Sequence, residues 1–267
     1  MYTFSYYLVE RSKALSSLPT AYWTLVPVAV RIPEEFLGPM ISQGHRFPGF
    51  MQKGFEIMAL PDTLPAFTPD EYLAFERSSE SKHEYLDGLI YAMAGSSPEH
   101  STICVNVSEV ITRQLRGTPC RPFSANMQIR CLSAPTTTRR RRGLFAYPDL
   151  LVVCGEPVFH DMQQDVLVNP TLIVEVLSPS TEAYARGEKF LRYQELASLT
   201  DYVLVAQRYP CLEHFAKQAH GQWLLTIETH LSGSIFIASI NCHLPLAEVY
   251  EWVQFPTSDA PASTSNA

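Results

Sequence analysis

The stretch PTLIVEVLSPST, residues 170–181, predicts a strand that is buried on both faces of a sheet. The run from Leu172 to Leu177 is aliphatic and largely β-branched, and the Ser-Pro-Ser that follows is typical of the end of a strand. Glu175 lies in the middle of this run. Because a buried, unpaired carboxylate is strongly destabilising or takes up a proton, Glu175 needs a partner or a cation.

A second acid lies in a similar setting. Asp149 follows Pro148 in YPDLLVVC, residues 147–154, which also predicts a strand. If the two strands are neighbours, Asp149 and Glu175 converge, and two close carboxylates stay ionised only with help from a cation. Mg²⁺, which prefers oxygen ligands, would resolve the repulsion. Taken singly, Asp149 also fits a turn and Glu175 an arginine partner, but the pair together favours a metal site.

Phosphodiester cleavage also needs a cationic side chain near the transferred phosphoryl group. Leu177 shares the face of Glu175 where a lysine would serve, and the next lysine is Lys189, on a helix predicted over 181–199. Glu84 would supply a third carboxylate, and His100 is a fourth candidate. Lys189 and His100 equally fit solvated helix positions, so the residues alone leave their roles open.

Local signals predict a mixed α/β domain spanning residues 58–253, with a central sheet flanked by helices. The segment from Thr68 to Glu71 is a helix start, with Thr at the N-cap and an acid three residues later. Asp87-Gly88 predicts a two-residue hairpin turn, and Gly117 the end of a helix that begins at Pro98. Further strands are predicted over 127–132, 147–154, 171–177, 201–207, 211–217, 222–230 and 234–240.

The two ends of the chain lack this order. Residues 1–57 show no sustained periodicity and predict an irregular extension; it is either a real arm or a mis-called start before Met58, and both alternatives stay open. Residues 254–267 are small and polar, which predicts a disordered tail. The apolar run 21–30 is about half the ~20 residues that a membrane span needs. We therefore expect no membrane association, no signal peptide and a cytoplasmic location.

Composition narrows the functional classes. Apolar residues make up 46% and charged residues 18% of the 267, which favours a substantial core over global disorder. The net charge of −7 argues against a strongly basic nucleic-acid binder, although local basic patches remain compatible with it. The run Arg139–Arg142 would either grip a DNA backbone or be a solvated loop, and the second interpretation is favoured.

The cysteine and histidine spacings do not predict a zinc site. None of the six cysteines forms a CxxC pair, and the eight histidines form no HxxxH or HExxH pair. Dispersed cysteines in apolar surroundings predict reduced core residues of an intracellular protein.

Four stretches, taken in their order along the chain, carry a family resemblance: residues 83–100 (HEYLDGLIYAMAGSSPEH), 147–153 (YPDLLVV), 173–193 (IVEVLSPSTEAYARGEKFLRY) and 199–207 (LTDYVLVAQ). They resemble the Uma-two family of restriction-endonuclease-like proteins, within the PD-(D/E)XK nuclease superfamily. The resemblance covers about residues 67–253 and implies a restriction-endonuclease-like core. It also implies Mg²⁺-dependent hydrolysis of DNA phosphodiester bonds, with Mn²⁺ as a substitute.

The resemblance also implies roles for individual residues. Asp149 supplies the acid of the PD motif, Glu175 the acid of the third motif, Lys189 the lysine displaced onto the helix, and Glu84 the acid of the N-terminal region. Asp149 and Glu175 would hold the metal. Ala185 departs from the family, which commonly has an aspartate there. The alternative function is a catalytically inactive module that binds nucleic acid or a protein partner, and a homodimer is compatible with duplex cleavage by symmetric pairs.

Overall fold

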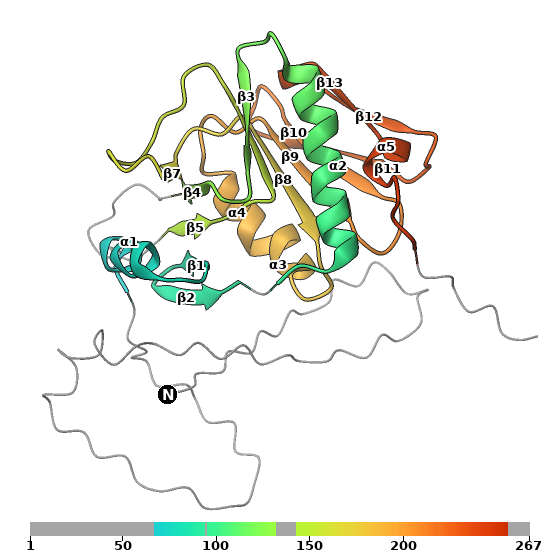
Figure 1. The fold of residues 1–267 in the computed structure, drawn as a ribbon. Helices are drawn as coiled ribbons and strands as arrows, with labels where there is room; N and C mark the ends of the chain where they lie inside the picture. Colours follow the sequence, from blue (N-terminus) through green and yellow to red (C-terminus); the bar gives the residue numbers. More distant parts are fainter. Residues whose placement is uncertain (1–66, 94, 132–142, 256–267) are drawn as a thin grey trace, which may run out of the picture.

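The structure is a computed structural model that describes residues 67–93, 95–131 and 143–255 (Figure 1). Its first half contains α1 (Pro69–Ser78), β1 (His83–Leu86), β2 (Leu89–Ala92), α2 (Pro98–Leu115), β3 (Cys120–Ser124), β4 (Gln128–Cys131), β5 (Leu144–Ala146) and β6 (Leu150–Cys154). The middle contains β7 (Val166–Leu167), β8 (Leu172–Leu177), α3 (Glu182–Tyr184), the π-helix η3 (Ala185–Lys189) and α4 (Phe190–Tyr193). The last part contains β9 (Asp201–Ala206), β10 (Leu212–Lys217), β11 (Trp223–Glu228), β12 (Ser234–Ile237), the 3₁₀-helix η4 (Ala238–Ile240), β13 (Cys242–Pro245) and α5 (Leu246–Val249).

Three local predictions are confirmed by the backbone. Thr68 caps α1 in a reciprocal capping box with Glu71. Asp87 and Gly88 both have positive φ, 48° and 100°, as a two-residue hairpin turn between β1 and β2 requires. Gly117, at φ 78°, follows the end of α2 and stops it.

The central element is a six-stranded sheet with the order β11-β10-β9-β8-β6-β3. β8 lies in its interior, parallel to β9 and antiparallel to β6, and all six of its residues are buried. A five-stranded sheet has the order β2-β1-β5-β4-β7. The predicted mixed α/β fold with a central mixed sheet is therefore confirmed.

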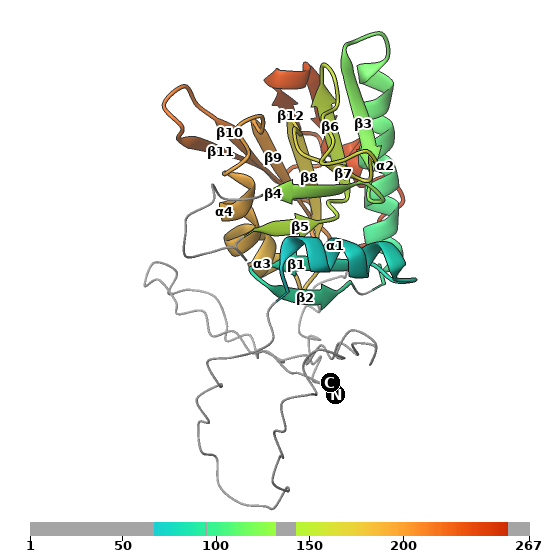
Figure 2. The same ribbon diagram turned by 90° about the vertical axis from the view of Figure 1, so that its left-hand side faces the viewer.

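Alternate residues of β8 face two different cores, as the two-residue period of a strand dictates. Val174 and Val176 pack with α2 and the C-terminal elements, whereas Ile173 and Leu177 pack with α4 and the five-stranded sheet. Figures 1 and 2 accordingly show α2 and α4 on opposite sides of the six-stranded sheet. Glu175 falls on the α4 side.

The helix predicted over 181–199 is shorter and less regular than expected. It is divided among α3, the π-helix and α4, and it ends at Tyr193. Gly187 in its middle lowers the preference for a regular α-helix, and π-segments often occur where a side chain must be aimed at a site. Beyond Tyr193 the chain makes turns, yet Leu196 and Leu199 are still buried.

Other predicted boundaries also move. β6 begins at Leu150 and not at 147, and the strand predicted over 234–240 ends at Ile237, where η4 begins. The strands β3, β5, β7 and β13 were not predicted: β5 and β7 have only three and two residues, and β3 and β13 each contain a proline, which weakens a strand signal. Residues 1–66, the arginine run and the chain after residue 255 lie outside the described residues.

The expectation that all cysteines are reduced is wrong. Cys120 and Cys154 form a disulfide between β3 and β6, where the strand register sets them directly opposite each other. This proximity depends on strand pairing and leaves no trace in the spacing along the chain. Cys104, Cys131, Cys211 and Cys242 are free. Within the described ranges, no helix has the length and apolarity to cross a membrane.

Candidate active site

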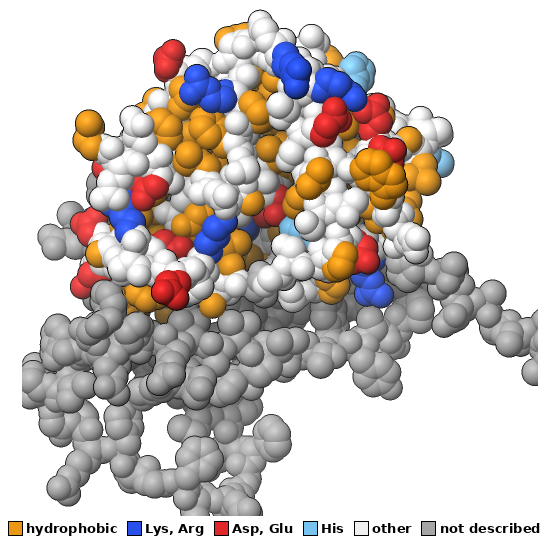
Figure 3. All heavy atoms as spheres, in the orientation of Figure 1, with side chains coloured by type: hydrophobic (Ala, Val, Ile, Leu, Met, Phe, Trp, Pro, Cys, Tyr) orange, Lys and Arg blue, Asp and Glu red, His pale blue; other side chains and the backbone are white. Residues whose placement is uncertain are grey.

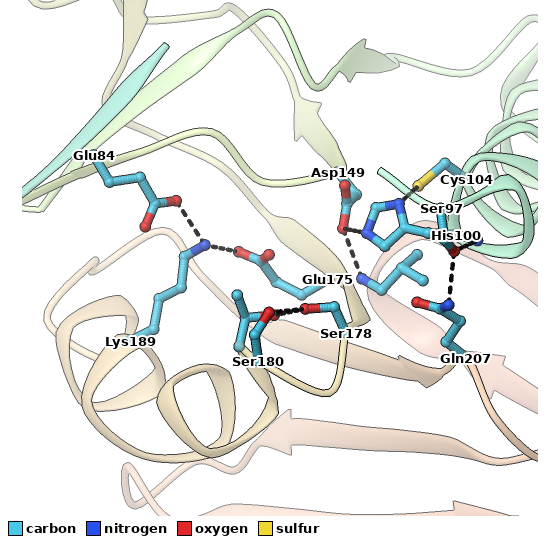
Figure 4. A network of polar contacts seen from close by, with 12 residues as sticks. Glu84, Ser97, His100, Cys104, Asp149, Glu175, Ser178, Ser180, Lys189 and Gln207 are labelled. Carbon is cyan, nitrogen blue, oxygen red and sulfur yellow. Dashed lines mark hydrogen bonds and ion pairs between the residues drawn. The ribbon is translucent and has the colours of Figure 1, made fainter. Parts of the chain in front are cut away.

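Three charged residues from distant parts of the chain meet between β1, β8 and the π-helix. Lys189 Nζ lies 2.8 Å from Glu84 Oε1 and 2.8 Å from Glu175 Oε1. All three are buried, with 5%, 9% and 7% of their surfaces exposed, respectively. Figure 4 shows the ammonium between the two carboxylates. The structure thus brings together three of the predicted site residues.

The carboxylate of Glu175 is oriented by one further group. Tyr193, on α4, donates its hydroxyl to Glu175 Oε1 at 2.7 Å. Burial raises the pKa of Glu175 to about 7; Lys189 opposes the rise, and the negative charges of Asp149 and Glu84 add to it. The ionised form is therefore unfavourable here even with a lysine in contact.

For Lys189, the neighbouring charges taken together have a larger effect on the pKa than burial. Burial favours its neutral form, but Glu175 and Glu84 outweigh burial and raise the pKa of Lys189 well above its ordinary value. Its ammonium is therefore charged at neutral pH.

Asp149 lies at the start of β6, next to β8. The register pairs Leu150 with Val174, so Asp149, just before β6, comes close to Glu175, and the two carboxylates influence each other electrostatically. Asp149 Oδ2 accepts a hydrogen bond from the Val176 backbone N–H at 2.7 Å. The two acids are therefore neighbours, as predicted if the strands paired.

His100 lies on the other side of Asp149, in the first turn of α2. Its Nε2 is 3.5 Å from Asp149 Oδ2. Burial lowers the pKa of His100, but the hydrogen bond and charge of Asp149, with a contribution from Glu175, outweigh burial and raise it. Asp149 therefore favours the protonated, positively charged form of His100.

Sequence reasoning missed several members of this region. Tyr193 contacts Glu175, and Cys104 Sγ lies 3.4 Å from His100 Nδ1. Gln207 Nε2 donates to Ser97 Oγ at 2.7 Å and so ties β9's end to the N-cap of α2. The four-residue spacings from Lys189 to Tyr193 and from His100 to Cys104 were visible signals, because such residues share a helix face.

Ala185 occupies an apolar position. It is buried against the core that includes Tyr193 and Tyr202, and its carbonyl accepts the Tyr202 hydroxyl at 3.1 Å. Alanine is therefore well accommodated here, four residues before Lys189.

The donor set fits a hard divalent cation. Glu84, Asp149 and Glu175 offer carboxylate oxygens; Lys189 contacts the first and the last of them, and His100 contacts Asp149. Burial is the main cause of the raised pKa of Glu175, and the negative charges of Asp149 and Glu84 add to it, so a cation beside this carboxylate would stabilise its ionised form. Mg²⁺ is commonly bound by one or two carboxylates together with water and phosphate oxygens. Asp149 and Glu175 are the residues that would hold it.

Residues 69–237 match the family model Uma2, described as "Putative restriction endonuclease". The chain belongs to the Uma2 family. This Uma2 protein is 35% identical over 192 residues to the uncharacterized protein slr1290 of Synechocystis sp., covering 72% of this chain and 95% of that one. It is 31% identical over 169 residues to the uncharacterized protein sll1609 of the same organism, covering 63% and 91%. The family resemblance inferred from the motifs is confirmed.

A solved structure has a similar fold. The "putative nuclease belonging to DUF820" from Anabaena variabilis superposes with a TM-score of 0.56 and 16% identity, covering 70% of this chain and 99% of that chain. At that identity the likeness supports the fold. Together with the family description, it places this Uma2 protein among nuclease-like proteins.

Proposed function

We propose that this Uma2 protein is a Mg²⁺-dependent endonuclease that hydrolyses phosphodiester bonds of DNA, with Mn²⁺ as a substitute metal. The observation that carries the proposal is the buried contact of Lys189 with Glu84 and Glu175, beside Asp149 on the adjacent strand. The cluster gathers three acids and one lysine from four parts of the fold. Stability alone explains it poorly, because taking charged groups out of water costs free energy that their mutual attraction offsets only when every charge is paired.

The roles follow from the contacts. A divalent cation bound by Asp149 and Glu175 would polarise the phosphodiester and lower the pKa of an attacking water. Lys189 keeps Glu84 as a partner when Glu175 is engaged as a ligand, so its ammonium stays in the site to stabilise negative charge on the phosphoryl group. Tyr193 holds the Glu175 carboxylate, and His100 adds positive charge at Asp149.

The substrate would approach from the Asp149 side. The side chains of Asp149 and His100 are 17% and 15% exposed, compared with 7% for Lys189. In Figure 3, acidic and histidine side-chain atoms are visible next to each other in a hollow near the middle of the displayed face, between the regions of α2 and α4. Such a hollow would accept a phosphate group once a divalent cation offsets the acidic charge.

The second candidate function is a catalytically inactive module that binds nucleic acid or a protein partner. The contact of Lys189 with two carboxylates is compatible with it as well, because a lysine held in this way also serves as a structural ion pair. The substitution of Ala185 for the family's usual aspartate points the same way. A homodimer, as proposed for duplex cleavage, is compatible with either function.

The decisive experiment is a cleavage assay on supercoiled plasmid and on single-stranded DNA with Mg²⁺, Mn²⁺ or EDTA. We expect nicking or linearisation with either metal and none with EDTA. Asp149→Asn should abolish it, whereas Asp201→Asn is the matched control, since Asp201 is a buried acid on β9 that contacts His214 instead of the site. DNA binding without cleavage under all metal conditions would favour the inactive module.

A further inference from the structure

A second cluster of metal-binding side chains lies beside the proposed Mg²⁺ ligands. His100 and Cys104 are four residues apart on α2, and Asp149 faces them from the start of β6. One donor atom from each of the three lies within 4.8 Å of the other two. Figure 4 shows the imidazole between the thiol and the carboxylate. The sequence spacings predict no zinc site, because the third donor comes from another element.

Hydrogen bonds and close contacts hold these three donors in place. His100 Nδ1 is 3.4 Å from Cys104 Sγ, and His100 Nε2 is 3.5 Å from Asp149 Oδ2, so both neighbours lie close to the ring, of which one nitrogen would bind the ion. Ser97 caps the backbone N–H of His100 at 3.2 Å and is itself held by Gln207. The Val176 N–H holds Asp149. Two helix positions one turn apart and a strand end therefore present the donors from rigid elements.

We propose that His100, Cys104 and Asp149 form a second divalent-metal site, suited to Zn²⁺ and related transition ions. Imidazole nitrogen, thiolate sulfur and carboxylate oxygen are the donors that such ions take, whereas Mg²⁺ and Ca²⁺ take oxygen. Three protein ligands leave a fourth tetrahedral position open for water or a phosphate oxygen, as in catalytic zinc sites. On binding, the Cys104 thiol and the protonated His100 imidazole each pass a proton to solvent, and a sulfur–metal and a nitrogen–metal bond replace the sulfur–hydrogen bond and one nitrogen–hydrogen bond.

This site is separable from the proposed nuclease centre. It shares Asp149 with that centre but does not use Glu175 or Lys189, which lie on the other side of Asp149 (Figure 4). Metal binding here is therefore measurable whether or not the chain cuts DNA. The competing interpretation is that His100 and Asp149 form an ion pair with no metal, and that Cys104 is a neighbouring core residue.

The test is a titration of the metal-free full chain with Co²⁺, without added thiol so that the Cys120–Cys154 disulfide stays intact. We expect a near-ultraviolet thiolate-to-Co²⁺ charge-transfer band that saturates at about one ion per chain and is removed by Zn²⁺. Cys104→Ser should abolish the band, whereas Cys242→Ser, a change at another free cysteine, should keep it. His100→Gln should weaken Co²⁺ binding by about tenfold or more, and Glu175→Gln should keep the band.

A second measurement guards against variants that fold poorly. In the wild-type chain, Zn²⁺ should slow alkylation of Cys104 by iodoacetamide at least about tenfold, as read by mass spectrometry of its peptide. Alkylation at the same rate with and without Zn²⁺ would overturn the proposal. A Co²⁺ spectrum that lacks the band, or a band unchanged in Cys104→Ser, would do the same. A positive spectrum in a chain that does not cut DNA would leave this site standing and remove the proposed nuclease.

Discussion

Two carboxylates in neighbouring strands of the same sheet have opposite surroundings. Glu175, in β8, faces the core on the α4 side, together with two other acids and one lysine. Asp201, in the parallel strand β9, falls on the other face and accepts hydrogen bonds from three side chains. His214 Nε2 lies 2.6 Å from its Oδ1, Thr200 donates at 2.7 Å, and Ser239 also donates. Both residues are buried, so burial alone does not separate them.

The difference appears in their proton affinities. Burial would raise the pKa of Asp201, but the hydrogen bonds from His214, Ser239 and Thr200 outweigh burial and lower it. Burial and the two neighbouring acids raise that of Glu175 to about 7. A buried acid whose donors satisfy it stabilises the fold. A buried acid that is left with excess negative charge marks a place for a cation, which is the physical basis for looking for active sites at perturbed groups.

The largest expected effect concerns turnover at the Glu175 cluster. Lys189→Ala should lower DNA cleavage by about 10²–10³-fold, because one preorganised electrostatic contact to the transition state is lost. Mn²⁺ binding, measured by calorimetry, should change much less. Lys189→Arg should rescue poorly, since a planar guanidinium does not replace an ammonium in a closed site.

The control for that comparison is Lys217→Ala, in β10 on the far side of β9, which should change cleavage by less than about twofold. A Lys189→Ala enzyme with activity within twofold of wild type would show that the lysine serves the fold.

The second prediction concerns the free energy of unfolding, to which Asp201 should contribute more than Glu175. Asp201→Ala should destabilise the metal-free chain by about 1–3 kcal/mol, because it leaves the buried His214 without its acceptor. Glu175→Gln should cost less than about 1 kcal/mol, because the neutral side chain matches the protonation that the site favours. Urea unfolding at neutral pH measures both. Equal losses would remove the distinction between the two environments.

The third prediction concerns pH. The folded pKa of Glu175, about 7, lies above its ordinary 4.5, so the folded chain binds more protons between these values. The contribution of Glu175 to the stability of the metal-free protein therefore falls as pH rises from about 4.5 to about 7. Asp201 has the opposite sign: its contribution is complete above its ordinary value of 3.8 and is lost as pH falls through its lowered folded pKa.

Urea midpoints in EDTA from pH 3 to pH 8 test these signs. The stability of wild type relative to Glu175→Gln should decline between about pH 4.5 and 7, and relative to Asp201→Asn it should shrink only below about pH 4. A flat Glu175→Gln difference would show that Lys189 compensates Glu175 fully.

The smallest expected effect is from removing residues 1–57. A chain that begins at Met58 should keep the surroundings of Glu175 and of Asp201 unchanged, because the removed sequence lacks the periodicity of packed elements. Its melting temperature should match that of the full chain within about 2 °C, which corresponds to about 0.5–1 kcal/mol in a domain of this size. Calorimetry measures this. A larger drop would show that these residues pack on the core.

Much of the local structure could be predicted from the sequence, because local structure depends on near neighbours. The capping box at Thr68, the turn at Asp87-Gly88 and the end of α2 at Gly117 each result from side-chain and backbone preferences within a few residues. The apolar run of β8 likewise predicts burial on both faces, and a carboxylate inside such a run is anomalous by its neighbours alone. The family motifs then point to Asp149, Lys189 and Glu84 as companions of Glu175.

Only the tertiary structure decided which residues meet. Glu84 and Lys189 are 105 positions apart, and their contact depends on how β1 and the π-helix pack against β8. The pairing of β6 with β8 sets Asp149 beside Glu175, and the docking of α2 brings His100 and Cys104 to the same carboxylate. The pairing of β3 with β6 joins Cys120 to Cys154. Strand order and helix docking minimise the free energy of the whole chain, so no local pattern records them.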